Sequence, residues 1–359
     1  MSIEKWSTVS TNRLDWVDTA KAISIILVVV LHLRDQFEQF SLQSPQLDFF
    51  TEVSANLRMP MFFAVAGLFA SKWLSKSWRD LGQGKLALLV WVFILWQPVV
   101  FAYRLLVHWV LDGLSWQYTA EQALRVLASP IRPNGELWFL WTLALFFVIG
   151  RWTAKFSPIA QVATAASVSL IWMTLVEPSL PEIVYDAIGS GWHGIFRYYF
   201  LFIGFALFSK QIRTAVSHLK WHTSALLFCI WLDASLLAAY YEIPPNASLF
   251  ILSLLGVAGG IGLANLIGGL ALLRYLGRQT LPIYLAHSAI IAIFLCEITA
   301  LGLTPAVTFN LYLSTLILTT VVIACALGLS QLKPLKYMYQ RPAFPSERVA
   351  SPSKRKSVA

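Results

Sequence analysis

The sequence has 359 residues, of which 57% are hydrophobic and only 13% are charged, and its mean hydropathy is positive. Soluble domains carry about 25% charged residues, so this composition predicts an all-α, polytopic membrane protein. The net charge of +9 is explained by membrane topology, and no nucleic-acid partner is expected. Three cysteines lie far apart in apolar segments, so neither a metal site nor a disulfide framework is expected.

The N-terminal segment contains Glu4, Lys5, Arg13 and Asp15, and no small-residue cleavage site follows the first apolar run. We therefore expect no signal peptide, so this run remains as a membrane helix. Apolar stretches of about 17–25 residues predict membrane-spanning helices. Ten such helices are expected, at residues 17–34, 53–71, 86–110, 136–150, 158–177, 195–209, 223–241, 247–270, 280–302 and 306–328.

The distribution of basic residues predicts the orientation of these helices. If the N-terminus is cytoplasmic, the inner segments carry 20 Lys and Arg, whereas the outer segments carry only Arg34, Arg125 and Arg132. This asymmetry follows the positive-inside rule and places both termini in the cytoplasm. We expect residues 1–330 to form one membrane domain and residues 331–359 to form a basic, disordered cytoplasmic tail that contacts anionic lipid.

The first apolar segment carries polar side chains along one stripe. At about 100° per residue, Asp18, Lys21, His32 and Asp35 share a narrow face of a helix. Ionisable groups in hydrocarbon are costly and normally face a protein or water-filled interior. Either His32 is a functional histidine at membrane depth, or Asp18 and Lys21 lie in the interface and His32 caps the far end.

Other polar residues form one cluster on each side of the membrane, and the first helix connects the two clusters. The distance from Asp18 to His32 is about 21 Å along a helix, comparable to the pantetheine arm of coenzyme A. A cytosolic acyl-CoA would place its phosphates on the inner basic residues and its thioester near His32. The candidate residues for binding this cofactor are Arg13, Asp18, Lys21, Arg278, Tyr284 and His287.

The outer cluster supplies candidate catalytic residues. Neutral His32 is suited to act as a general base on an acceptor hydroxyl. Arg58 would stabilise the developing oxyanion or bind an acidic acceptor, and Glu136 would orient the imidazole or a sugar. Arg197 and Trp138 are the candidate residues for binding the acceptor.

Five segments resemble the membrane acyltransferase family 3, the integral-membrane O-acyltransferases of bacterial envelopes. They are DWVDTAKAISIILVVVLH (15–32), RMPMFFAVAGLF (58–69), ELWFLWTLALFF (136–147), RYYFLFIGFALF (197–208) and LGRQTLPIYLAHSAII (276–291). The resemblance implies a protein of the bacterial inner membrane that moves acetyl, succinyl or longer acyl groups. The donor would be acyl-CoA, and the acceptor a hydroxyl of an envelope glycan, lipid or small molecule. The family's functional positions match His32, Lys21, Arg58, Tyr284 and His287.

The sequence also departs from the family pattern. Lys21 stands where Arg is more common, and Ala66 stands where Ser often precedes Gly67. No soluble hydrolase-like domain is appended, so a second transfer step would need a periplasmic partner protein. Two alternatives remain: a glycan or lipid transporter that uses His32 as a proton relay, and a non-catalytic membrane scaffold. The sequence lacks the internal repeats that many transporters show.

Overall fold

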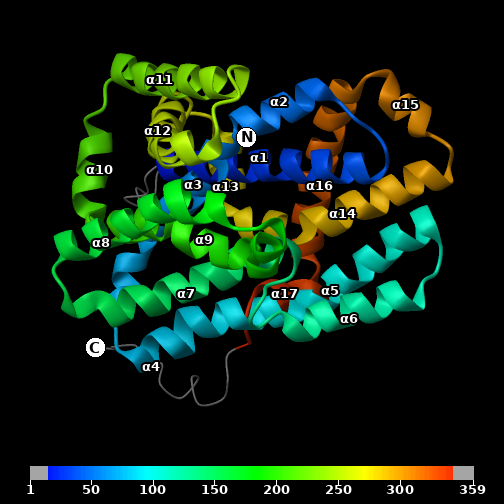
Figure 1. The fold of residues 1–359 in the computed structure, drawn as a ribbon, viewed down its shortest axis with the longest axis horizontal. Coiled ribbons are helices and arrows are strands. Elements are labelled where there is room, and N and C mark those ends of the chain that lie inside the picture. The colour runs from blue at the N-terminus through cyan, green and yellow to red at the C-terminus, as the bar shows by residue number, and fades with distance from the viewer. Residues whose placement is uncertain (1–14, 343–359) are drawn as a thin grey trace, which may run out of the picture.

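The structure is a computed structural model that describes residues 15–342, and every regular element within this range is a helix (Figure 1). Arg13 and the last part of the expected tail, residues 343–359, lie outside the described residues. The longer helices are α1 (Asp15–Gln39), α2 (Pro45–Val53), α3 (Ala55–Leu74), α5 (Ala87–Asp112), α6 (Trp116–Ala128), α7 (Trp138–Trp152), α8 (Pro158–Ile171), α9 (Glu182–Leu207), α10 (Ser209–Ser217), α11 (Trp221–Tyr240), α12 (Pro245–Leu266), α13 (Ala271–Arg278), α14 (Thr280–Ala300) and α16 (Leu311–Gln331). The short ones are α4 (Trp78–Leu81), η1 (Gly82–Leu86), η2 (Gly135–Leu137), η3 (Thr153–Lys155), η4 (Trp172–Val176), η5 (Glu177–Ser179), α15 (Thr304–Phe309), η6 (Lys333–Leu335) and α17 (Lys336–Tyr339).

Nine helical stretches of the described residues are long and apolar enough to cross a membrane. They correspond to nine of the ten expected spans, and the prediction of an all-α, polytopic membrane protein is confirmed. The expected span at 195–209 lies in α9. This helix is not among the nine stretches, and it carries Glu182, Asp186, His193 and Arg197 along its length.

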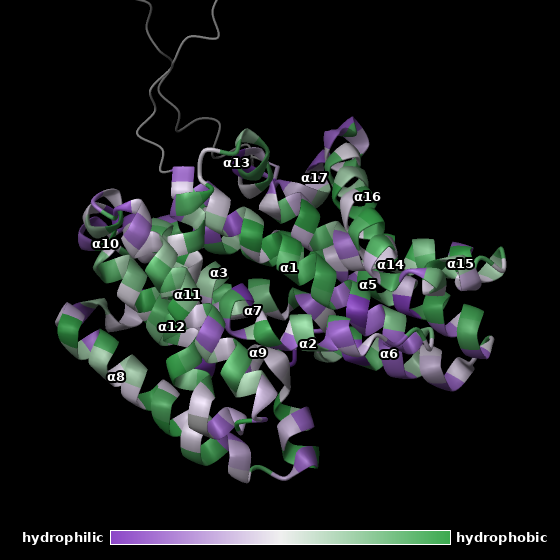
Figure 2. Ribbon diagram, turned by 90° about the horizontal axis from the view of Figure 1, so that it is seen from above, coloured by the Kyte–Doolittle hydropathy of each residue, from purple (hydrophilic) through white to green (hydrophobic). Residues whose placement is uncertain are grey.

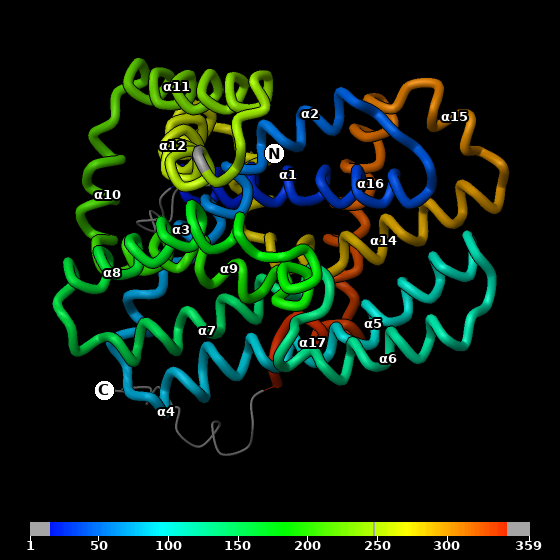
Figure 3. The backbone as a smooth tube through the Cα atoms, viewed as in Figure 1, coloured from blue at the N-terminus to red at the C-terminus, as the bar shows by residue number. Residues whose placement is uncertain are grey.

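Helix α1 lies in the middle of the molecule, beside helices from the far end of the chain. Figure 3 shows it next to α14 and α16, and all three pack against one another. The Gln36 side chain of α1 donates a hydrogen bond to the Ser288 carbonyl oxygen of α14, at 3.1 Å. In Figure 2 the middle of α1 and α14 is hydrophobic, whereas hydrophilic residues gather on peripheral elements such as α10 and α17.

Two glycines allow neighbouring backbones to approach α1 and α3 closely. A Cβ atom on Gly277 of α13 would lie 1.7 Å from the Asp18 carbonyl oxygen, and one on Gly256 of α12 would lie 1.9 Å from the Asn56 carbonyl oxygen. No side chain fits at either place, so both contacts require glycine. Small residues that let helices approach in this way are typical of membrane proteins.

The first part of the expected tail is folded. The indole nitrogens of Trp91 and Trp96 on α5 donate hydrogen bonds to the carbonyl oxygens of Tyr337 and Met338, at 2.9 and 2.8 Å. The Tyr339 ring is buried against Trp96, with the ring centroids 5.7 Å apart. Residues 333–339 therefore dock against the start of α5 through specific contacts.

Candidate active site

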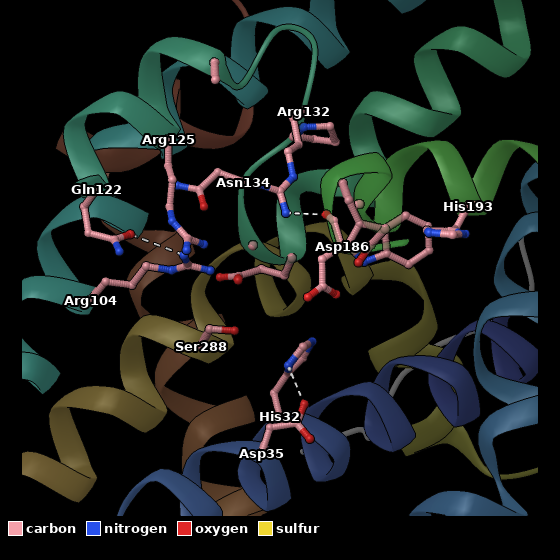
Figure 4. Close-up of a pocket in the computed structure, with 18 of the residues that line it drawn as sticks. His32, Asp35, Arg104, Gln122, Arg125, Arg132, Asn134, Asp186, His193 and Ser288 are labelled. Atoms are coloured by element: carbon pink, nitrogen blue, oxygen red, sulfur yellow. Dashed lines mark hydrogen bonds and ion pairs between the residues drawn. The ribbon is translucent and has the colours of Figure 1, made fainter. Parts of the chain in front are cut away.

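A cavity of about 790 Å³ lies between α1, α5, α6, α9 and α14 (Figure 4). Its lining is largely polar and includes four of the predicted site residues, His32, Glu136, Trp138 and Arg197. Helix α6 and the first half of α9 were expected to be parts of outer segments. The sequence therefore predicts that this cavity faces the outer side, and we call it the outer cavity.

His32 projects from α1 into the outer cavity (Figure 4), and its side chain is 27% exposed. Its Nδ1 atom lies 3.5 Å from Oδ2 of Asp35, one turn further along α1. A carboxylate in this position favours the tautomer with a proton on Nδ1, which leaves the Nε2 lone pair for the cavity. The pair is close enough for the carboxylate to orient the imidazole electrostatically, as the partner of a histidine base does.

His287 lies beside His32, with the two ring centroids 5.0 Å apart. Its side chain is fully buried, and its Nδ1 atom lies 2.7 Å from the Tyr284 carbonyl oxygen. Its Nε2 atom lies 3.2 Å from the hydroxyl of Ser288, which lines the outer cavity. The sequence placed His32 and His287 in separate clusters, and the fold brings them into contact because α1 and α14 pack side by side.

Glu136 is buried at the start of the short helix η2 and lines the same cavity. Its carboxylate accepts a hydrogen bond from the Tyr103 hydroxyl at 3.0 Å. Its charge interacts electrostatically with the imidazoles of His287 and His32. The Tyr284 hydroxyl donates a hydrogen bond to the backbone carbonyl oxygen of Glu136, which fixes η2 against α14.

Arginines form the wall opposite His32. Arg104 donates to the Gln122 side chain at 3.3 Å, and Arg132 donates to the Asp186 carbonyl oxygen at 2.5 Å. Each guanidinium lies against a glycine with positive φ, Arg104 against Gly135 (φ 52°) and Arg132 against Gly189 (φ 73°). A side chain at either glycine would be strained and would crowd the arginine.

Another arginine of this wall belongs to a surface ion pair. Arg125 pairs with Glu121 at 2.7 Å, and both side chains are about half exposed. Burial raises the pKa of Tyr118, which lines the same wall, although Arg104 and Arg125 oppose the shift. Tyr118 therefore keeps its hydroxyl proton at neutral pH and can donate a hydrogen bond to a ligand.

Arg197 is held by a carboxylate behind the cavity surface. Its Nε and NH2 atoms donate to both oxygens of Glu177, at 2.9 and 2.6 Å. The Nδ1 atom of His193 lies 2.8 Å from the same carboxylate, and both side chains are buried. This arrangement orients Arg197 at the cavity surface and compensates its charge there.

A second cavity, of about 220 Å³, lies near the opposite ends of α1, α5 and α14. Lys21 and Lys85 contribute the charged groups of its lining, which is otherwise mostly apolar and includes Ala66 and Tyr284. We call it the inner cavity, because these helix ends are expected at the cytoplasmic face. Tyr284 lines the inner cavity and donates a hydrogen bond to Glu136 of the outer cavity, so this contact links the linings of the two cavities.

The other predicted site residues within residues 15–342 lie outside the two cavity linings. Asp18 is buried and bonded to Lys21 at 2.8 Å and to Arg278 at 3.1 Å, so it fixes the lysine at the edge of the inner cavity. Arg58 donates to the Thr51 carbonyl oxygen at 2.6 Å. It lines neither cavity, and an oxyanion role would require its guanidinium to turn toward His32.

Sequence reasoning missed much of the outer cavity. It gave Arg104 no role in the site, and Arg125 and Arg132 served only to indicate topology. The available signal was their rarity, since two of the three basic residues in the expected outer segments line this cavity. Ser288 gave no signal, because a lone serine in an apolar helix is unremarkable. Within residues 15–342, no cluster of His, Cys, Asp and Glu is suited to hold a metal ion.

A family model described as "Acyltransferase domain" matches residues 14–329 of the chain. The chain therefore belongs to membrane acyltransferase family 3, in keeping with its nine described helical stretches that are long and apolar enough to cross a membrane. It is also similar to the nodulation protein NolL of Sinorhizobium fredii, with 24% identity over 229 residues. That match covers 63% of this chain and 57% of NolL. No solved structure matches the chain.

Proposed function

We propose that the protein takes an acyl group, acetyl or succinyl, from cytosolic acyl-CoA and transfers it to a hydroxyl of an envelope glycan, lipid or small molecule. It would do so across the bacterial inner membrane. The observation that carries this proposal is the His32–Asp35 pair at the surface of a large polar cavity. An apolar cavity with two lysines lies on the far side of the Tyr284–Glu136 contact.

The inner cavity supports the donor side of this proposal. Lys21 and Lys85 would bind the phosphates of acyl-CoA, and the apolar lining around Ala66 suits the pantetheine arm. Lys21 precedes His32 by about 16 Å along α1, a distance that an extended pantetheine arm spans. The thioester would reach His32 past Tyr284, and Arg13 and Arg278 are further candidates for the phosphates.

The outer cavity supports the acceptor side. Its arginines, carboxylates and amides offer hydrogen-bond donors and acceptors to a polar acceptor such as a sugar, and Trp138 offers an aromatic face. The Nε2 atom of His32 would remove the proton from an acceptor hydroxyl as the oxygen attacks the acyl carbonyl carbon. The carbon–sulfur bond then breaks, and the CoA thiolate takes the proton back from the imidazolium.

The test uses purified protein in nanodiscs with labelled acetyl-CoA and succinyl-CoA, wild type beside His32→Ala. Loss of a general base lowers the rate by about 10²- to 10⁴-fold, so we expect CoA release to fall by this factor while acyl-CoA binding survives. His222→Ala is the matched control, because His222 is exposed on α11 and lines neither cavity.

The outcomes separate the competing functions. Full CoA release by His32→Ala would refute the general-base role. An absence of acyl-CoA binding by the wild type would refute the donor assignment, and glycan or lipid uptake in proteoliposomes would then favour a transporter. Release of CoA only when an envelope extract is added would identify the extract as the source of the acceptor.

A further inference from the structure

Ser288 has the geometry of an activated nucleophile. Its hydroxyl oxygen lies 3.2 Å from Nε2 of His287, the preceding residue on α14. Ser288 lines the outer cavity, and Figure 4 shows it projecting from α14 toward the same space as His32 from α1. His32 thus lines the cavity itself, whereas the buried His287 contacts a residue of the lining, Ser288.

The surroundings of His287 determine which of its nitrogens carries the proton. Nδ1 lies 2.7 Å from the Tyr284 carbonyl oxygen and 3.2 Å from the Ile283 carbonyl oxygen. Carbonyl oxygens only accept hydrogen bonds, so in the neutral imidazole the proton is on Nδ1. Nε2 then carries the lone pair, and the Ser288 hydroxyl is the donor to it. A serine bonded to a histidine that a third group orients is the usual arrangement of a serine nucleophile.

The position of Ser288 fits a carrier between donor and acceptor. Tyr284 lines the inner cavity, and Ser288 follows it by one helical turn, about 6 Å along α14, in the lining of the outer cavity. The His287 ring, 5.0 Å from that of His32, joins this serine to the proposed acceptor base. An acyl group on Ser288 would lie between the two binding sites.

We infer that Ser288 is a covalent acyl carrier, an inference that rests on the proposed function and divides the transfer into two steps. In the first, His287 Nε2 takes the hydroxyl proton and Ser288 Oγ attacks the thioester carbonyl carbon. The carbon–sulfur bond breaks, and the CoA thiolate takes the proton from His287. In the second, His32 takes the proton of the acceptor hydroxyl, whose oxygen attacks the serine ester. The Ser288 oxygen leaves and regains a proton from His32.

The experiment incubates nanodisc protein with acetyl-CoA in the absence of an acceptor, followed by intact-protein and peptide mass spectrometry. We expect one acetyl group on Ser288, with the highest occupancy in His32→Ala, because that variant lacks the base of the second step. Ser288→Ala should carry no adduct and should release CoA at least about 100-fold more slowly. Ser288→Cys retains a nucleophile and should carry a thioester that neutral hydroxylamine cleaves, which also distinguishes a lost nucleophile from a misfolded protein.

Ser253→Ala is the control, because Ser253 is a buried serine on α12 that lines neither cavity. Transfer by Ser288→Ala within about threefold of the wild type would overturn the carrier. A wild type that releases CoA while His32→Ala and Ser288→Cys both remain unmodified would also overturn it. Either result leaves the proposed function standing with direct attack on the thioester. A wild type that neither binds nor cleaves acetyl- or succinyl-CoA would refute the proposed function itself, and the carrier with it.

Discussion

The Tyr284 hydroxyl on α14 donates a hydrogen bond to the Glu136 carbonyl oxygen, and this contact lies between the inner and outer cavities. Phe139 reinforces it, because its ring meets that of Tyr284 edge to face with the centroids 5.4 Å apart. Under the proposed function, an acyl group that moved from one cavity to the other would pass this contact. The same contact would be a barrier that keeps water of the outer cavity away from a thioester in the inner cavity.

Replacing Tyr284 should therefore uncouple cleavage of the thioester from transfer of the acyl group. In Tyr284→Ala the ring and the hydrogen bond are both lost, so we expect acyl-CoA hydrolysis without an acceptor to rise severalfold relative to transfer. Tyr284→Phe keeps the ring and should lie between this variant and the wild type. The measurement is the ratio of CoA released to acyl product formed, and an unchanged ratio in Tyr284→Ala would contradict the barrier.

The lysines of the inner cavity should recognise the phosphates of the donor. A hydrogen bond to a charged group contributes about 1.5–3 kcal/mol, so Lys21→Gln or Lys85→Gln should raise KM for acetyl-CoA by about 10-fold or more. Neither substitution should alter KM for acetyl-pantetheine, which lacks the nucleotide. Lys72→Gln serves as the control, because Lys72 is exposed at the end of α3. An equal rise for both donors would exclude phosphate recognition.

Asp35 should act on the reaction by orienting His32. Hydrogen-bonding partners of metal-bound histidines change activity by about 10- to 100-fold, and we expect Asp35→Asn to lower kcat by a factor of this order, with little change in KM for acyl-CoA. Glu38→Gln is the matched control on the same helix, since Glu38 pairs with Arg34 rather than with His32. A variant with normal kcat and a raised KM for the donor would assign Asp35 to donor binding instead.

Glu177 should matter for stability more than any surface acid. Its buried carboxylate binds Arg197 and His193, and removing one member of a buried pair destabilises a protein by about 3–5 kcal/mol. We expect Glu177→Gln to lower the free energy of unfolding by about 3 kcal/mol, as measured by denaturant titration of the protein in mixed micelles. Glu121→Gln, which removes the exposed partner of Arg125, should lose less than about 1 kcal/mol. Similar losses in both variants would contradict this contrast.

Sequence patterns predicted the membrane class and nearly all of the helices. Membrane helices are long and apolar, and each makes its backbone hydrogen bonds within its own segment. Each can therefore be recognised from the local sequence. Charged residues within them are rare, and His32 and Glu136 stand out for that reason. The span at 195–209 differs most from its prediction, because α9 carries His193 and Arg197, begins already at Glu182 and ends at Leu207.

The site is different because its members come from helices that are distant in the chain. The sequence placed His287 with the donor and His32 with the acceptor, whereas the packing of α1 against α14 puts their rings 5.0 Å apart. The proton on Nδ1 of His287 depends on a backbone carbonyl, and the partner of Ser288 depends on two side-chain rotamers. No local pattern carries this information.

The sequence by itself determined that this protein is a multi-pass, helical membrane protein of an acyltransferase family, because hydropathy and family motifs are local properties of the chain. Only the tertiary structure decided which polar residues share a cavity. Where the helices do not pack closely, as around His32, a cavity remains between them. Where two backbones are in contact, as at Gly277 and Asp18, there is no space for a cavity. That difference depends on the mutual placement of α1, α13 and α14, which sequence periodicity does not specify.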